Sequence, residues 1–250
     1  MLFRSVRGNY TWAKNLDDGS AWNTSVSANT PAYVMLPGQP KLDYGPAATD
    51  IRQLAAINGS YELPFGKGHY LGANAGSFTN RAIGGWTLSG IAALQTGFPF
   101  SPQLGYNPTG SGDTRNPVRP NVNPNFTGNL YPRTPSQYFN AAAFSAPAYG
   151  TIGNVSRDTL VGPGFANLDL SLLKSTQVSE RVRAQFRAEF FNILNRANFS
   201  TPNEVVYSSG PTQGTTANQT AAAVVSPTAG VITATAGTSR QIQFGVKLLF

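Results

Sequence analysis

The chain closes on a stretch in which apolar and polar residues alternate: Gln241-Ile242-Gln243-Phe244-Gly245-Val246-Lys247-Leu248-Leu249-Phe250. A period of two predicts a β-strand whose two faces meet different surroundings. The stretch ends on an aromatic residue with no polar tail after it. Such an end is typical of a lipid-facing strand in a membrane β-barrel, where aromatic girdles lie at both membrane interfaces.

The composition suits short strands joined by long polar loops. Hydrophobic residues make up 40% of the 250 residues and charged residues only 12%, about half the usual share. Aromatic residues make up 11%, which argues against a disordered chain. No apolar run approaches the roughly 20 residues that a membrane-spanning helix needs. The composition therefore leaves a soluble β-protein or an outer-membrane barrel.

The net charge is +7 and the chain has no cysteine. The distribution of the charges and the lack of cysteine argue against several classes of protein. The positive residues are scattered and form no run; Arg181, Arg183 and Arg187 alternate on one predicted strand face. We therefore expect no nucleic-acid partner. Without cysteine the chain has no disulfide, thiolate metal site or cysteine nucleophile.

Alternating segments predict strands over residues 2–14, 50–63, 85–96, 165–174, 181–190 and 240–250. The segment 181–190 has the clearest pattern, in which Val182, Ala184, Phe186, Ala188 and Phe190 alternate with Arg181, Arg183, Gln185, Arg187 and Glu189. A soluble sandwich strand with one wetted face can produce this pattern. So can a barrel strand whose charged face lines a water-filled lumen.

The lengths of the connections favour the barrel. Long irregular connections follow the first, third and fifth strands, with only short candidate elements such as 138–144. The connection after the fourth strand is short and that after the second is intermediate. This alternation is typical of outer-membrane barrels, which have long extracellular loops and short periplasmic turns. We predict an all-β fold: a partial antiparallel transmembrane β-barrel, forming an open curved sheet with two free edges, in the cell outer membrane and in contact with its lipid.

Five segments carry a resemblance to a known family: Tyr61-Glu62-Leu63-Pro64-Phe65-Gly66-Lys67-Gly68, Gly84-Gly85-Trp86-Thr87-Leu88-Ser89-Gly90, Gln95-Thr96-Gly97-Phe98-Pro99-Phe100, Gly162-Pro163-Gly164-Phe165-Ala166-Asn167-Leu168-Asp169-Leu170-Ser171 and Phe186-Arg187-Ala188-Glu189-Phe190-Phe191-Asn192-Ile193-Leu194-Asn195. Together they resemble the C-terminal barrel of Oar-like TonB-dependent outer-membrane receptors, which carry a carboxypeptidase-regulatory-like domain. The resemblance implies a plugged barrel of about 22 strands, of which this chain would supply the last six.

Residues 1–250 are therefore expected to be the C-terminal segment of such a receptor barrel. Residues 1–7 lack the apolar stretch of a signal peptide, and the family's regulatory-like domain, plug and TonB-contacting segment are not recognised in the sequence. The implied function is uptake of a large ligand of unknown identity, with the TonB complex reached through the N-terminal region. The second candidate is a non-transporting outer-membrane or surface β-protein for adhesion or display, and the third is a soluble extracellular β-sandwich.

The last residues also resemble the β-signal that the barrel-assembly machinery reads in this family. The matching positions are a polar residue, a glycine, a hydrophobic residue and a terminal aromatic: Gln243, Gly245, Leu248 and Phe250. The resemblance makes the barrel-assembly machinery an expected partner of this chain.

The sequence predicts no enzyme, cofactor or metal site. His69 is the only histidine, so a zinc site or a catalytic triad would depend on it alone. Gly66-Lys67-Gly68 lacks the flanking residues of a phosphate-binding loop. Asp17, Asp18 and Asp43 match no EF-hand spacing and are expected to be solvated loop carboxylates.

Three further sets of residues carry expectations. Asp169 and Glu189 are expected to pair with arginines of the strand 181–190 on the lumen face. Aromatic residues near strand ends are expected in interfacial girdles: Trp12, Tyr61, Trp86, Phe190 and Phe250. Aromatic residues of the long loop are candidates for ligand contact: Tyr106, Tyr131, Tyr138, Phe139 and Tyr149.

Overall fold

A computed structural model describes residues 4–19, 33–113 and 118–250. Its main feature is one antiparallel sheet of six strands in the order β1-β4-β5-β11-β12-β15. The strands span Arg4–Trp12, Gln53–Glu62, Trp86–Gln95, Phe165–Gln177, Arg183–Phe191 and Gln241–Leu249. Each strand pairs with the next long strand along the chain, so the sheet is a simple meander.

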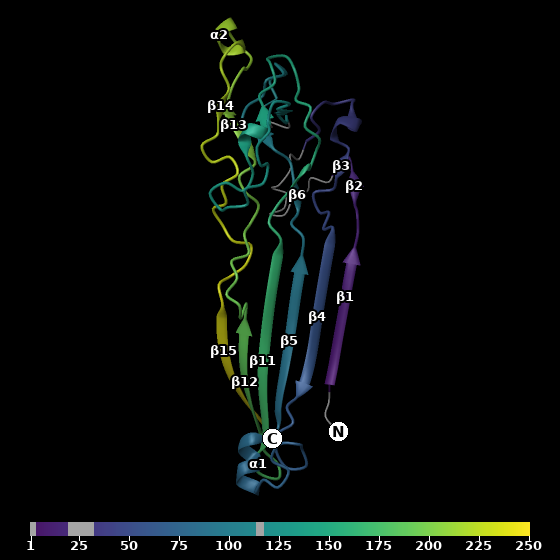
Figure 1. The fold of residues 1–250 in the computed structure, drawn as a ribbon, viewed down its shortest axis with the longest axis vertical. Coiled ribbons are helices and arrows are strands. Elements are labelled where there is room, and N and C mark those ends of the chain that lie inside the picture. The colour runs from purple at the N-terminus through teal and green to yellow at the C-terminus, as the bar shows by residue number, and fades with distance from the viewer. Residues whose placement is uncertain (1–3, 20–32, 114–117) are drawn as a thin grey trace.

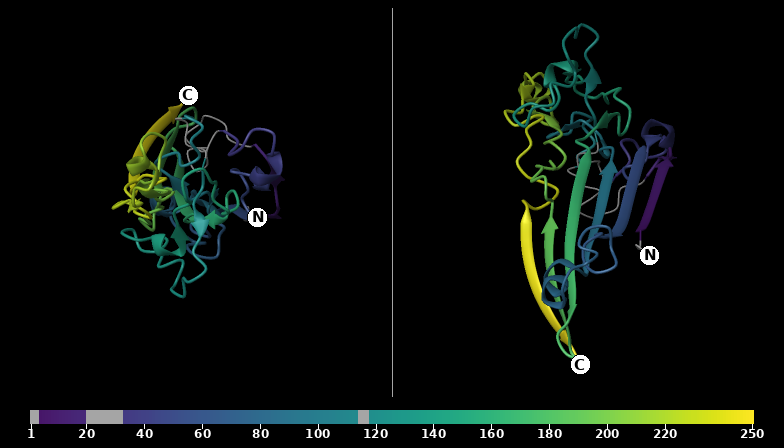
Figure 2. Two further views of the ribbon diagram at one scale, coloured as in Figure 1. Left: turned by 90° about the horizontal axis from the view of Figure 1, so that it is seen from above. Right: turned by 60° about the horizontal axis from the view of Figure 1, so that its bottom comes forward.

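The six predicted strands are all confirmed, with their ends shifted by a few residues. Residues 2 and 3 of the first predicted strand lie outside the described residues. The fourth strand is longer than predicted and continues to Gln177, so the turn before β12 moves to residues 178–182. Polar residues of 175–177 do not end the strand, because they still form ladder pairs with β12. The open sheet is also confirmed: β1 and β15 lie at opposite edges (Figure 2).

The connections separate to the two ends of the sheet (Figure 1). Residues 63–85 and 178–182 lie at the end of the sheet where β1 begins and β15 ends. The long connections 96–164 and 192–240 extend from the opposite end, as do the described parts of 13–52. This arrangement agrees with the long and short alternation that the sequence predicts.

The long connections are not irregular loops, because they fold together into a cap. The cap contains short paired strands: β2 (Leu16–Asp17), β3 (Gly45–Pro46), β6 (Pro99–Phe100), β7 (Gln103–Leu104), β8 (Asn121–Val122), β9 (Phe144–Ser145), β10 (Leu160–Val161), β13 (Val205–Ser209) and β14 (Val224–Val225). It also contains the 3₁₀ turns η2 (Pro40–Asp43) and η3 (Ala141–Ala143) and the helix α2 (Thr216–Gln219). The candidate element 138–144 is confirmed in its second half, where η3 spans Ala141–Ala143 and β9 begins at Phe144.

The buried hydrophobic core lies in the cap. Phe100, Phe139 and Val206 are fully buried together, although they come from three distant segments. The ring centroids of Phe100 and Phe139 lie 5.7 Å apart, and the Phe139 ring packs edge-on against Phe144. A second cluster contains Leu104 and Val118. The cap is thus a folded unit stabilised by its own apolar packing.

At the other end of the sheet, the connection 63–85 contains the helix α1 (Ser77–Ile83). No helix among the described residues has the length and apolar character to cross a membrane.

Candidate functional site

The register of the sheet sorts its side chains onto two faces. Residues directly opposite each other in an antiparallel pair point to the same side. One face follows the pairs Gly8, Ile57, Ala92 and Leu168 from β1 to β11, and continues through Leu170, Phe190 and Ile242 to β15. This apolar face is open to its surroundings, and Val246 on it is 75% exposed. An exposed surface of this extent requires an apolar partner.

The polar face lies on the other side of the same strands. Ser89 Oγ donates to Ser60 Oγ at 3.1 Å between β5 and β4. Arg187 and Glu189 form an ion pair at 3.6 Å on β12, which confirms the expected partner of Glu189. The expectation for Asp169 is wrong. Its Oδ1 accepts hydrogen bonds from the Asn167 side chain and the Asn192 backbone N–H, both at 2.8 Å, so it holds the end of β12.

The predicted girdle residues lie at the ends of the strands on the apolar face. Trp12 and Phe190 are near the cap, whereas Tyr61 and Trp86 are near the opposite end. Phe250 follows the last residue of β15 and is 92% exposed. Of the other proposed signal residues, Gln243 and Gly245 face the polar side, opposite Glu189 and Arg187, and Leu248 lies on the apolar side.

The family-like segments contact one another where strands meet loops. Leu63 N donates to Trp86 O at 2.9 Å, which joins the first two segments. A Cβ on Gly97 would lie 1.9 Å from the carbonyl oxygen of Gly162, so only glycine allows this close approach of the third and fourth segments. Asp169 and Asn192 join the fourth and fifth. These residues therefore shape the strand ends.

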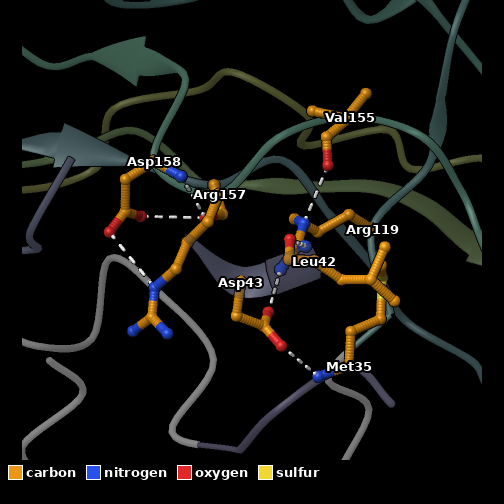
Figure 3. A network of polar contacts seen from close by, with 8 residues as sticks. Met35, Leu42, Asp43, Arg119, Val155, Arg157 and Asp158 are labelled. Atoms are coloured by element: carbon orange, nitrogen blue, oxygen red, sulfur yellow. Dashed lines mark hydrogen bonds and ion pairs between the residues drawn. The ribbon is translucent and has the colours of Figure 1, made fainter. Parts of the chain in front are cut away.

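A buried ion pair joins two distant parts of the cap (Figure 3). Arg119 Nη1 contacts Asp43 Oδ1 at 2.7 Å, and both side chains are 1% exposed. Arg119 also donates from Nε to Val155 O and from Nη2 to Leu42 O, and Asp43 Oδ2 accepts from Met35 N. The expectation that Asp43 is a solvated loop carboxylate is wrong, because Arg119 neutralises it inside the cap. The partner of Asp43 is thus an arginine of the chain and not a metal ion.

A second polar group lies beside this pair. Arg157 Nε is 3.6 Å from Asp158 Oδ2, and both side chains are buried. Ser101 Oγ donates to Asp158 Oδ1 at 2.8 Å and accepts from its backbone N–H. Gln103 Nε2 donates to Glu204 Oε2 at 2.9 Å. The pKa of Glu204 is raised to about 8, mainly by burial and also by the charge of Asp158, while the Gln103 hydrogen bond opposes the rise.

A cavity of about 900 Å³ lies between the cap and the end of the sheet. It is within the usual size of a small-molecule site. Gln95 of the polar face lines it, together with Tyr131 and Tyr138 from the cap. Four arginines also line it: Arg52, Arg133, Arg157 and Arg196.

The other sequence candidates lie apart from this cavity. His69 and Lys67 line a polar pocket beside α1, at the opposite end of the sheet. Tyr106, Tyr138 and Phe139 are core residues of the cap. Of the two tyrosines in the cavity wall, Tyr131 is more exposed than Tyr138. Among the described residues, no group of three or more His, Cys, Asp or Glu side chains could hold a metal ion.

Sequence reasoning missed Arg119, Arg157 and Glu204. Arg119 and Asp43 are 76 residues apart, and no local pattern joins them. The sequence offered only a weak sign that the two residues are buried. In a chain poor in charge, Arg119 follows Val118 and Asp43 follows Leu42, both apolar.

The open sheet, its apolar and polar faces and its capped end define the wall of an outer-membrane barrel. A comparison with protein families agrees, because residues 4–243 match the outer membrane beta barrel domain. The chain belongs to this family and lies in the outer membrane. Neither the curated proteins nor the solved structures gave a match.

Proposed function

We propose that this chain forms the closing strands of a TonB-dependent receptor barrel that binds and takes up a large ligand. The apolar face would contact outer-membrane lipid, and the polar face would line the lumen. The observation that carries the proposal is the cavity, whose wall is formed by Gln95 at the end of the polar face and by residues of the cap. The family-like segments at the strand ends support the same class of receptor.

Two free strand edges support a larger barrel. Among the described residues, β1 and β15 each pair with one strand of the main sheet. A free edge invites pairing with another strand. We propose that further strands of the receptor close the barrel between them, and that the chain has no enzymatic role.

A surface protein for adhesion or display is the second candidate. The hydrophobic core of the cap favours it, because a folded cap presents a fixed surface. The test is to purify the full-length protein and measure its binding to the periplasmic domain of TonB. Binding that disappears when the region preceding the barrel is deleted supports the receptor. A full-length protein without a plug and without TonB binding supports display.

A further inference from the structure

We propose that the cavity between the cap and the sheet binds a cluster of carboxylate or phosphate groups carried by the large ligand of the receptor. The inference names a ligand class for the proposed receptor, and it rests on that function for the size of the ligand and for its placement at the lumen mouth. Anion binding itself requires neither TonB nor a plug.

The wall of the cavity carries more positive than negative side chains. The lining has four guanidinium groups and two carboxylates, those of Asp50 and Asp158. Both carboxylates are already engaged: Asp50 accepts from Arg52 at 2.9 Å and from Asn15 N at 2.8 Å, and Asp158 accepts from Ser101. The wall therefore keeps an excess of positive charge.

Arg157 is a buried arginine in this wall that lacks hydrogen-bond acceptors in the described part of the chain. Its side chain is 2% exposed, and its Nε and Nη2 atoms have no hydrogen-bond partner among the described residues. The 3.6 Å separation from Asp158 exceeds hydrogen-bond length. A buried guanidinium with unmade hydrogen bonds is unfavourable, and an anionic ligand would supply the acceptors.

The rim of the cavity completes the site. Arg133 and Arg196 are exposed and form no ion pair with any described residue. Arg133 lies over the ring of Tyr131, with 5.6 Å between its Cζ and the ring centroid, which orders the guanidinium at the rim. Tyr131 is fixed in turn because its hydroxyl accepts from Val161 N at 3.2 Å. Two rim arginines above a buried one match a ligand with several anionic groups.

The experiment is calorimetric titration of the intact protein, purified in detergent at low salt, with citrate and separately with inorganic pyrophosphate. Saturable binding of at least one probe is expected, and it should weaken at least tenfold in the double variant Arg133→Gln/Arg196→Gln. These side chains are exposed, so the variant should keep the fold. The matched control, Arg81→Gln on α1, removes an exposed arginine at the other end of the sheet and should bind as the wild type does.

A wild type that binds neither probe at millimolar concentration overturns the proposal, as does equal binding by all three proteins. Arg157→Lys tests the buried group: it keeps the charge but loses the planar donor set, and should weaken binding with an unchanged melting temperature. A full-length protein that binds citrate or pyrophosphate but does not bind TonB would refute the receptor function and support the anion site.

Discussion

At the scale of single residues, the cap depends on charges that are paired inside it. The Arg119 guanidinium bonds to the Asp43 carboxylate and to the carbonyl oxygens of Leu42 and Val155, so it joins its own segment to two others. Removing one partner of a buried ion pair leaves an uncompensated charge. The pair should therefore control whether the cap stays closed.

We expect Arg119→Met to destabilise the cap by about 3–5 kcal/mol, because Asp43 would remain buried without its cation. Adding Asp43→Asn should restore much of the loss, since the amide oxygen can still accept from Met35 N. Limited proteolysis of the purified protein measures this, with cleavage between residues 33 and 164 as the readout. Equal protease resistance of the wild type and Arg119→Met would contradict the role of the pair.

Glu204 should make the cap sensitive to pH. Its pKa in the folded cap is about 8, against an ordinary value of 4.5. Between these values the folded cap holds a proton that the opened cap releases, so stability is full below pH 4.5 and falls as pH rises to about 8. The opening equilibrium should increase by up to about tenfold per pH unit in this window.

Hydrogen exchange of the amides around β13, measured from pH 5 to pH 9 and corrected for intrinsic exchange, follows this change. Glu204→Gln should flatten the profile because glutamine does not titrate. An identical pH profile for the wild type and Glu204→Gln would show that Glu204 does not link protons to cap closure.

At the scale of elements, alternation was enough to predict the six long strands, because their two faces meet different surroundings. It also placed the alternating apolar residues of β12 on one side of the sheet: Ala184, Phe186, Ala188 and Phe190. The cap could not be predicted in the same way. Its strands are often two residues long, too short for a period, and its core joins residues as distant as Phe100 and Val206. The partners of Asp43 and Asp169 depend on these long-range contacts.

The last strand carries the prediction about assembly. Deleting Phe250 from the full-length protein should lower its level in the outer membrane, because the terminal aromatic of the proposed signal is lost. Immunoblots of outer-membrane fractions measure this level. The control is Phe78→Ala, which removes another exposed aromatic from α1. Unchanged levels after loss of Phe250 would refute the assembly signal.

At the scale of the whole molecule, the chain has an apolar face and two free strand edges. Both promote association in water. Residues 1–250 expressed alone should therefore need detergent to stay dispersed, which size-exclusion chromatography with light scattering can measure. A monodisperse monomer in detergent-free buffer with cooperative unfolding would refute the membrane placement of the sheet.

The central claim is that the sheet is a membrane wall with its apolar face in lipid, and a cysteine scan of β12 tests it most directly. The chain has no cysteine, so single cysteines at positions 184 to 189 of the intact protein in bilayers can each carry a nitroxide label. Relaxation by oxygen, which enters lipid, should dominate at 184, 186 and 188, and relaxation by a water-soluble nickel complex at 185, 187 and 189. Equal accessibility at successive positions, or the opposite alternation, would contradict the account.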